Sequence, residues 1–119
     1  MTTEHWYQAS KTVDGVDADY ILEAGSAQDA KFRGRAVDLR TDWEDVKVDV
    51  MLNLLRAKFA DNQLKTWLLE TSGRKLVDAS PGSGHFWGED TETGTGQNML
   101  GVLLMQVRDE IELGYAGQQ

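Results

Sequence analysis

Two long stretches of this chain carry apolar residues three and four positions apart, which is the spacing of one face of an α-helix. In the first stretch these residues are Val46, Val50, Met51, Leu54, Leu55 and Phe59. In the second they are Met99, Leu100, Leu103, Leu104, Val107 and Ile111. Two such helices in 119 residues favour a mostly α fold. If strands are present, the fold is α+β with little strand.

Both long helices have recognisable ends. Thr41 and Glu44 have the spacing of a capping box, in which the two side chains satisfy free N–H groups at a helix start. This box predicts a helix over 42–59. The last helix should end at Gly114, because glycine readily adopts the left-handed conformation that closes helices.

Two shorter helices are indicated by capping residues. Ser26 opens a helix that ends near Gly34, and Asp29 makes its first turn a carboxylate variant of the capping box. Asp61 can cap another helix, which Gly73 would close. The expected buried side of this second helix consists of Leu64, Trp67 and Leu68.

A further short helix is predicted over residues 4–13. Glu4, Gln8 and Lys11 are four and three residues apart, so they form one polar stripe along this helix. Its apolar side is expected to consist of Trp6, Ala9 and Val13, and the pattern breaks at Asp14, Gly15 and Asp17. Glutamate and lysine on a helix face are most often simply solvated, so the stripe alone does not indicate a site.

Between the helices lie two segments without helical periodicity. Residues 75–79 are compatible with a strand or with extended chain. Residues 80–97 contain five glycines and the only proline, and they carry Phe86 and Trp87, which we expect to be exposed. A loop of this length in a small protein is usually functional or disordered.

The length of the chain is typical of one domain. Hydrophobic residues make up 40% and charged residues 27%, which is the usual balance of a soluble protein that folds alone. We therefore predict a single compact domain over 1–114, followed by a C-terminal tail at 115–119.

The acidic charge balance argues against general nucleic-acid binding. The chain has 20 acidic and 12 basic side chains, and its net charge of -8 repels a phosphate backbone over most of the surface. A phosphorylated ligand would have to be held by local groups, such as backbone N–H donors.

Cysteine is absent, which excludes disulfides and thiolate zinc sites, and the default compartment is the cytoplasm. No apolar run approaches the roughly 20 residues of a membrane span, so we expect no membrane partner. The two histidines, His5 and His85, are too few and too far apart to suggest a metal site. We interpret His5 as a partly buried, hydrogen-bonded side chain.

The glycine-rich segment 85–98 is a second candidate site. Its glycines would let the backbone approach a ligand, and free N–H groups at the start of the last helix would favour a phosphate. It lacks the lysine and hydroxyl residue of the Walker motif, and no Rossmann-type strand leads into it. Taken alone, the segment is more simply interpreted as a solvent-exposed loop, and Trp6 and Trp87 as packed side chains.

The two candidate segments occur in an order that resembles one family, over nearly all of the chain. Residues 4–11, Glu-His-Trp-Tyr-Gln-Ala-Ser-Lys, resemble the first conserved helix of the NADAR domain, also called the YbiA-like family. Two further segments resemble the next two helices of the family. The matching residues are Ala30, Lys31, Gly34, Arg35, Trp43, Lys47, Val50, Met51, Lys58 and Phe59. The last part of the chain resembles the tryptophan-glycine loop and the last helix of the family. The matching residues are Trp87, Gly88, Gly94, Gly96, Asn98, Leu100, Gly101, Leu104, Met105 and Arg108.

The chain departs from the family pattern in two places. Members usually carry a segment with a serine-asparagine-phenylalanine motif before the first helix, whereas this chain begins three residues ahead of Glu4. Gly84 occupies the position at which the family commonly has an acidic residue. We expect that Glu89, Asp90 or Glu92 compensates for this acid.

The resemblance implies an N-glycosidase. Members of the family act on phosphorylated riboflavin-biosynthesis intermediates or remove ADP-ribose from guanine in nucleic acid. Breaking a bond between ribose C1 and an amine develops positive charge at C1 and negative charge on the departing nitrogen. The implied catalytic residues are Glu4 and Lys11, as an acid-base pair. We prefer a scheme in which Lys11 forms a Schiff base with the ring-opened sugar and Glu4 shuttles protons; direct attack by water, with Glu4 as base or stabiliser, is the alternative.

The implied substrate-binding residues are Gln8, Trp87, Gly88, Gly94, Gly96 and Asn98. In this interpretation Trp87 provides a flat face for a base, and Asn98 hydrogen-bonds ribose or phosphate. No cofactor and no metal are required, and a dinucleotide would be a substrate. Two other hypotheses remain: an inactive module that binds ADP-ribose or a nucleotide, and an acidic interaction protein.

Overall fold

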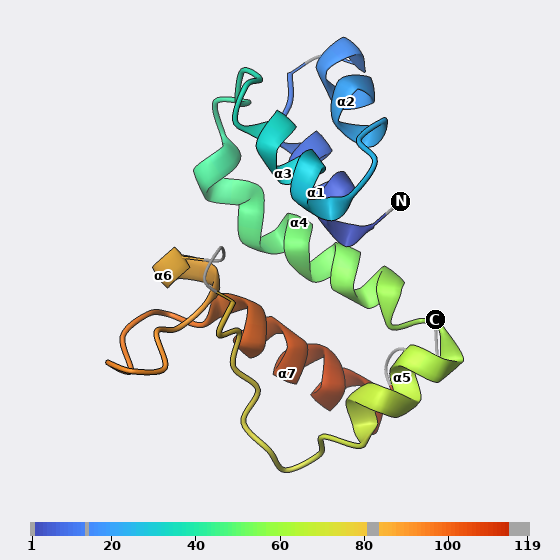
Figure 1. Ribbon diagram of the computed structural model, residues 1–119. Helices are drawn as coiled ribbons and strands as arrows, with labels where there is room; N and C mark the ends of the chain where they lie inside the picture. Colours follow the sequence, from blue (N-terminus) through green and yellow to red (C-terminus); the bar gives the residue numbers. More distant parts are fainter. Residues whose placement is uncertain (1, 14, 81–83, 115–119) are drawn as a thin grey trace. The chain divides into compact units, whose positions relative to one another are not determined.

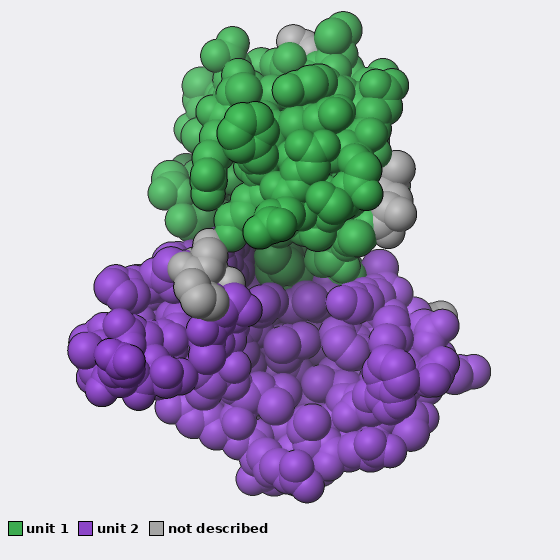
Figure 2. Space-filling model, viewed as in Figure 1, with its two compact units in different colours: residues 1–54 green, residues 55–119 purple. Residues whose placement is uncertain are grey.

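The structure is a computed structural model that describes residues 2–13, 15–80 and 84–114. These parts of the chain form seven α-helices (Figure 1), and their β pairing is limited to one isolated antiparallel bridge between Thr12 and Leu39. The prediction of a mostly α fold is therefore confirmed. Backbone contacts divide the chain into two compact units, Met1–Leu54 and Leu55–Gln119 (Figure 2).

The first unit is built around three short helices, α1 (Thr3–Ser10), α2 (Gly15–Leu22) and α3 (Ala27–Gly34), which pack against one another. Ile21 is completely buried at the centre of this unit. The buried residues around it are Ala9, Ala24 and Ala30, with Ala18, Leu22 and Val37 packed against them. Because alanine side chains are small, the helix backbones can approach closely around one large residue.

The starts of α1 and α3 are capped as their sequences allow. The Thr2 hydroxyl accepts from the His5 N–H at 3.2 Å, and His5 Nδ1 in turn accepts from the Thr2 N–H at 3.1 Å. His5 Nε2 therefore carries the proton, which it donates to the Ala24 carbonyl at 2.7 Å. The interpretation of His5 as a hydrogen-bonded side chain is confirmed. The Ser26 hydroxyl accepts from the Asp29 N–H at 3.0 Å, as predicted.

Helix α4 (Trp43–Lys58) begins one residue later than a capping box on Thr41 would require. The Asp42 carbonyl accepts the first helical hydrogen bonds, and its carboxylate pairs with the Arg40 guanidinium at 2.6 Å. Residues 43–54 of α4 belong to the first unit and its last turn to the second. The buried side chains of this helix are Trp43, Met51 and Leu55.

The second unit contains α5 (Asn62–Leu69), α6 (Gly84–Trp87) and α7 (Met99–Glu112). Helix α7 packs against both α5 and α6. The buried apolar side chains of this unit are Leu55, Leu68, Leu103 and Val107. Asp61 caps α5, as predicted, by accepting from two main-chain N–H groups at 3.0 Å.

Two arginines tie the elements of the second unit together. Arg108 is buried, and its Nη1 donates to the carbonyls of Thr71 and Arg74 at 2.8 and 2.9 Å, in the turn that follows α5. Arg56 forms a bidentate pair with Glu110, at 2.9 and 2.7 Å. These contacts join α7 to the segments that precede and follow α5.

Several details of the sequence-based prediction are corrected. Helices α2 and α6 were not predicted, since their short segments lack a clear apolar period. Trp6, Val13 and Trp67 are exposed rather than buried; α1 instead buries His5, Tyr7, Gln8 and Ala9. Segment 75–80 is extended chain without a strand partner among the described residues.

The glycine predictions hold in part. Gly114 follows α7 with φ 81°, and Gly73 is also left-handed, although it lies beyond the α5 cap at Glu70. The predicted tail, 115–119, lies outside the described residues, and the single domain over 1–114 stays a prediction. Of the described helices, none combines the length and the apolarity needed to cross a membrane.

Candidate active site

The polar stripe on α1 is organised by contact with α3. Gln8 lies one turn after Glu4, and its Nε2 donates to Glu4 Oε1 at 3.0 Å. Gln8 is only 3% exposed, because Gly34 of α3 packs directly against it: a Cβ on Gly34 would overlap Gln8 Oε1. The Glu4 carboxylate is therefore held by an amide that the packing of α1 on α3 immobilises.

The other end of the same amide is unusual. Gln8 Oε1 is buried and has no hydrogen-bond partner among the described residues. Leaving a buried acceptor unpaired costs about 1–3 kcal/mol, so most proteins avoid it outside functional sites. Gln8 thus holds Glu4 with one end of its amide, while the other end is an unpaired acceptor buried against Gly34.

Lys11 follows directly at the end of α1, where it is the C-cap residue. Its ammonium lies 5.4 Å from the ring centroid of Tyr7 and 5.9 Å from that of Trp43. These two rings meet edge to face with their centroids 5.1 Å apart. The half-buried Lys11 thus lies against an aromatic pair that shields one side of its ammonium from water.

The surroundings of Lys11 lower the pKa of its ammonium group. Burial lowers the pKa of Lys11 below the ordinary lysine value, and the carboxylate of Glu4 opposes this by raising the pKa. The positive charges of Lys31, Arg35 and Lys47 lower the pKa further. A lysine with a lowered pKa beside a fixed carboxylate is a common arrangement in active sites.

The residues predicted in the glycine-rich segment lie together in the second unit. The Asn98 N–H donates to the Gly88 carbonyl at 3.0 Å, and Gly96 lies so close that a Cβ on it would overlap this carbonyl. Gly94 and Gly96 have φ angles of 69° and 123°, which only glycine adopts without strain at both positions. These glycines fold the loop back on itself at the start of α7.

The side chain of Asn98 holds the protein's own backbone. Its Nδ2 donates to the Leu76 carbonyl and its Oδ1 accepts from the Asp78 N–H, both at 2.8 Å. Asn98 is buried and has a left-handed conformation with φ 49°, which asparagine tolerates better than most residues. The geometry therefore gives Asn98 a structural role, and its predicted hydrogen bond to ribose or phosphate stays a prediction.

Trp87 ends the short helix α6 and is half-buried rather than fully exposed. Its ring contacts that of Phe86 edge to face, at a centroid distance of 4.8 Å. This contact fixes the pair as a small aromatic unit beside the glycine loop.

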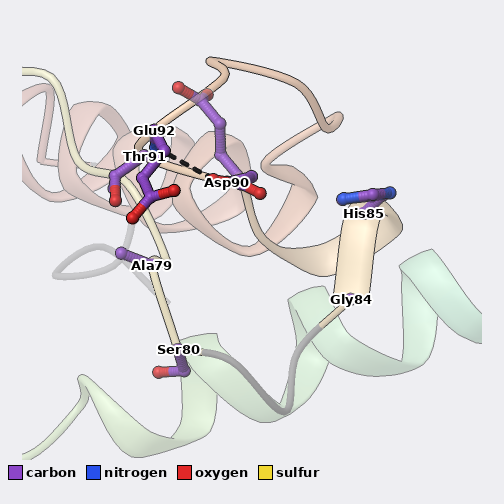
Figure 3. A pocket seen from close by; sticks show the side chains of 8 residues that line it. Ala79, Ser80, Gly84, His85, Asp90, Thr91 and Glu92 are labelled. Atoms are coloured by element: carbon purple, nitrogen blue, oxygen red, sulfur yellow. Dashed lines mark hydrogen bonds between the residues drawn. The ribbon is translucent and has the colours of Figure 1, made fainter.

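A cavity of about 420 Å³ opens beside α6 (Figure 3). Its lining residues are Ala79, Ser80, Gly84, His85, Glu89, Asp90, Thr91 and Glu92. Gly84 thus shares a cavity with Glu89, Asp90 and Glu92, the three acids among which a compensating residue was expected. The acidic lining suits N–H donors of an amine or heterocycle better than it suits a phosphate.

Of these acids, Asp90 is already engaged in the loop, since its Oδ1 accepts from the Glu92 N–H at 2.9 Å. Glu89 lies 3.9 Å from the Lys75 ammonium. Across the described residues, no group of three or more histidine or acidic side chains is arranged to hold a metal ion.

Comparisons with known proteins identify the family of this chain. The model of the NADAR domain family matches residues 1–112. This chain belongs to the NADAR domain family. It is 38% identical over 115 residues to N-glycosidase YbiA of Shigella flexneri serotype 5b, covering 94% of this chain and 71% of that protein. It is 38% identical over 116 residues to an N-glycosidase of Nostoc punctiforme, covering 92% of this chain and 73% of that one.

A NADAR-like region also occurs in a longer plant protein. The chain is 44% identical over 124 residues to the chloroplastic riboflavin biosynthesis protein PYRR of Zea mays, covering 92% of this chain but only 19% of the maize protein. The NMR structure of the Escherichia coli protein YbiA matches with a TM-score of 0.84 at 37% identity, over 96% of this chain and 68% of that one. The YbiA-like fold is thus shown, and the family includes hydrolases named N-glycosidases.

Sequence reasoning missed the surroundings of Lys11. Lys31, Lys47 and Trp43 were recognised only as family matches without a role, and Tyr7 only as part of the resembling segment 4–11. The available signal was helical spacing, because Lys31 and Arg35, like Trp43 and Lys47, are four residues apart. Only packing shows that the charges of Lys31, Arg35 and Lys47 act on the pKa of Lys11 and that the Trp43 ring lies beside it.

Proposed function

We propose that this chain is an N-glycosidase that hydrolyses the bond between ribose C1 and a nucleobase-like amine. The substrate is ADP-ribosylated guanine or a phosphorylated intermediate of riboflavin biosynthesis. The observation that carries the proposal is the pairing of a carboxylate held by Gln8 with the half-buried Lys11, whose pKa is lowered, in a NADAR chain.

In the preferred scheme Lys11 acts as a nucleophile. Its neutral amine adds to C1 of the ring-opened sugar, which transiently carries both nitrogens. The departing amine takes a proton delivered by Glu4 and leaves with the electrons of its bond to C1, so that Lys11 remains joined to C1 as an imine. Water then adds to the imine carbon, and hydrolysis of the imine returns ADP-ribose or the ribose phosphate, together with the free Lys11 amine.

In the alternative scheme no covalent intermediate forms. Glu4 activates a water molecule or stabilises the positive charge that develops at C1, while the Lys11 ammonium donates a proton to the departing nitrogen. The lowered pKa of Lys11 supports either role, because it eases both nucleophilic attack and proton release.

The binding residues of the second unit complete the proposal. Trp87 provides the flat face for a base, and Gly88, Gly94 and Gly96 let the backbone approach the ligand. Asn98 contributes by holding the extended segment before the loop, in addition to any contact with ribose or phosphate. No cofactor or metal takes part, and the ligand is a small nucleotide-like molecule or an ADP-ribosyl group.

The decisive measurement is release of the free base or amine. We expect the protein to release it from ADP-ribosylated guanine nucleic acid or from phosphorylated aminopyrimidine ribosides. Lys11→Ala and Glu4→Gln should each lower the rate by about 10²-fold or more, because acid-base groups typically contribute that much. Lys58→Ala, which removes a cation outside the stripe, is the control. Full activity in both stripe variants at unchanged thermal stability would contradict the roles assigned to them.

Chemical trapping separates the two schemes. Borohydride reduces an imine to a stable amine, so turnover in its presence should leave the sugar attached to Lys11, detectable by peptide mass spectrometry. Turnover without any adduct would favour direct attack by water.

A second candidate function is an inactive module that binds ADP-ribose or a nucleotide, favoured by Gly84 in place of the family's common acidic residue. This function predicts that ADP-ribose raises the thermal midpoint while no substrate releases its base. An acidic interaction protein would show neither effect.

A further inference from the structure

Gln8 is the one residue of the polar stripe that neither reaction scheme uses, although it is the most deeply buried of the three. It is 3% exposed, whereas Glu4 and Lys11 are half-buried. Its side chain lies between Glu4 on its own helix and Gly34 on α3, which packs against α1 (Figure 1). A ligand can therefore meet Glu4 and Lys11 more readily than it can meet Gln8.

The chemistry of Glu4 fixes the direction of the Gln8 amide. An ionised carboxylate only accepts hydrogen bonds, so the end of the amide that faces Glu4 must be its NH2 group. Gln8 Nε2 donates to Glu4 Oε1 at 3.0 Å, an ordinary hydrogen-bond distance. The carbonyl oxygen of the amide therefore faces the other way, toward Gly34.

The backbone of α3 closes this other side of Gln8. A Cβ built on Gly34 would overlap Gln8 Oε1 and would lie 2.8 Å from its Cδ and 3.2 Å from its Cβ, so α3 runs along the length of the side chain. The N–H groups of Arg35 and Ala36, which follow Gly34, donate to carbonyls of α3 at 3.2 and 3.0 Å rather than to Oε1. The close approach that leaves Oε1 unpaired among the described residues also keeps a ligand away from it.

An amide in this place destabilises the fold and serves only the carboxylate. A buried acceptor without a partner is unfavourable, and an apolar side chain of the same shape would avoid it. Glutamine differs from such a side chain by the N–H donor that it offers to Glu4. A hydrogen bond from a confined donor holds one oxygen of the carboxylate and orients the other. Orientation matters, because misplacing a reacting group by about 1 Å can lower the rate about 10²-fold.

We infer that Gln8 is a positioning residue: confined by Gly34, it aims the Glu4 carboxylate at the sugar without touching the substrate. The inference rests on the proposed function and deepens it, because it adds a residue that acts on the reaction through Glu4. It also replaces the predicted substrate-binding role of Gln8, since both ends of its amide face the protein.

The first experiment removes the donor and keeps the shape. Methionine is unbranched and has as many rotatable side-chain bonds as glutamine, so Gln8→Met fits the same space without a donor or an unpaired acceptor. We expect kcat for base release to fall roughly tenfold or more with KM little changed, while the midpoint of urea denaturation stays at or above that of the wild type. Gln106→Met is the matched control, because Gln106 also donates to a glutamate four residues away, Glu110, but in an exposed pair. Its kcat and KM should equal those of the wild type.

Three roles of Gln8 give different results in Gln8→Met. A positioning residue changes kcat alone. A substrate contact would instead raise KM, and a purely structural residue would lower the denaturation midpoint while leaving kcat per folded molecule unchanged. Either of these two results would overturn the inference.

Gln8→Glu tests the hydrogen bond itself. The introduced carboxyl group can donate to Glu4 only while it is protonated, and the two carboxylates repel each other once both are ionised. The ratio of kcat in this variant to kcat in the wild type should therefore fall toward high pH, where the pair loses its shared proton. The same ratio for Gln8→Met should show no such fall. A ratio for Gln8→Glu that does not fall would count against the hydrogen bond and overturn the inference.

A measurement independent of turnover uses the NMR signals of the side-chain NH2 groups. The Gln8 protons should exchange with water more slowly than those of the exposed Gln106, and Glu4→Ala should speed up exchange at Gln8 alone. Equal exchange at Gln8 and Gln106 in the wild type would show that Gln8 is not confined, which would overturn the inference.

The two proposals fail in different ways. Slowly exchanging Gln8 protons that depend on Glu4, in a chain that releases no base, would support the positioning of Glu4 and contradict the glycosidase. Base release at the wild-type kcat by Gln8→Met would support the glycosidase and contradict the role of Gln8.

Discussion

At the scale of single residues, the candidate site depends on how Gln8 is held. Its amide donates to Glu4 while Gly34 leaves just enough room for its other end. Glutamine has three rotatable side-chain bonds, and confinement between two helices reduces their freedom before any ligand binds. Gln8 therefore helps to fix the position of the Glu4 carboxylate.

Gly34→Ala tests this arrangement. The new methyl group would overlap Gln8 Oε1, so the amide must move and the hydrogen bond to Glu4 is lost. Alanine favours helix by up to about 1 kcal/mol over glycine, but overpacking costs about 1–3 kcal/mol, so we expect a net loss of stability. Chemical denaturation measures this change in the free energy of unfolding. The double variant Gly34→Ala, Gln8→Ala should recover stability but not activity; a fully active Gly34→Ala would contradict the role of Gln8.

At the scale of elements, the start of α7 is joined to the extended segment 75–80. Asn98 binds the backbone of that segment, and Gly101, one turn later, lies against the Leu76 carbonyl. Because these groups are backbone atoms, neither contact can be relieved by a rotamer change in the segment. The segment is thereby ordered without strand pairing, and it leads into the cavity at Ala79 and Ser80.

Gly101→Ala should loosen this junction. Its Cβ would overlap the Leu76 carbonyl and the Asn98 side chain, so we expect a loss of about 1–3 kcal/mol despite the better helix propensity of alanine. Urea denaturation and hydrogen exchange at Asp78 measure the effect. Gly15→Ala is the matched control, since Gly15 is also helical and a Cβ there meets no atom within 4 Å. Equal stability of the two variants would show that the contact is unimportant.

At the scale of the whole molecule, the net charge and the local charge near Lys11 oppose each other. The overall charge of -8 repels polyanions at long range, whereas the positive charges of Lys31, Arg35 and Lys47 lie close enough to Lys11 to lower its pKa. Salt screens long-range interactions more than short ones, so the two effects can be separated.

Ionic strength should therefore change the preference between substrates. The screening length falls from about 30 Å to about 10 Å between about 0.01 and 0.1 M salt. Over this range we expect kcat/KM for an ADP-ribosylated oligonucleotide to rise several-fold relative to that for a mononucleotide-sized phosphorylated riboside. Steady-state assays with both substrates measure the ratio. A ratio that falls steeply with salt would indicate a polyanion-binding surface and contradict the charge argument.

Much of the fold was predictable from local chemistry. Asp61 and Ser26 cap helices because their side chains reach free N–H groups within three residues, and Gly114 closes α7 because glycine tolerates a left-handed conformation. Helix α2 was missed because only Ile21 of it is fully buried, so its sequence shows no apolar stripe. Trp67 was wrongly assigned to the core since spacing identifies a face but not what covers it.

The candidate site, like the fold, was predictable from the sequence only in part. The stripe of Glu4, Gln8 and Lys11 was predictable from residue spacing alone, because a helix places residues three and four apart on one side. It could not show that Gln8 is confined by Gly34, or that cations from α3 and α4 act on Lys11. These relations join residues some 20 to 40 positions apart and arise only when helices pack. Burial and neighbouring charge, which set the pKa of Lys11, are properties of tertiary structure alone.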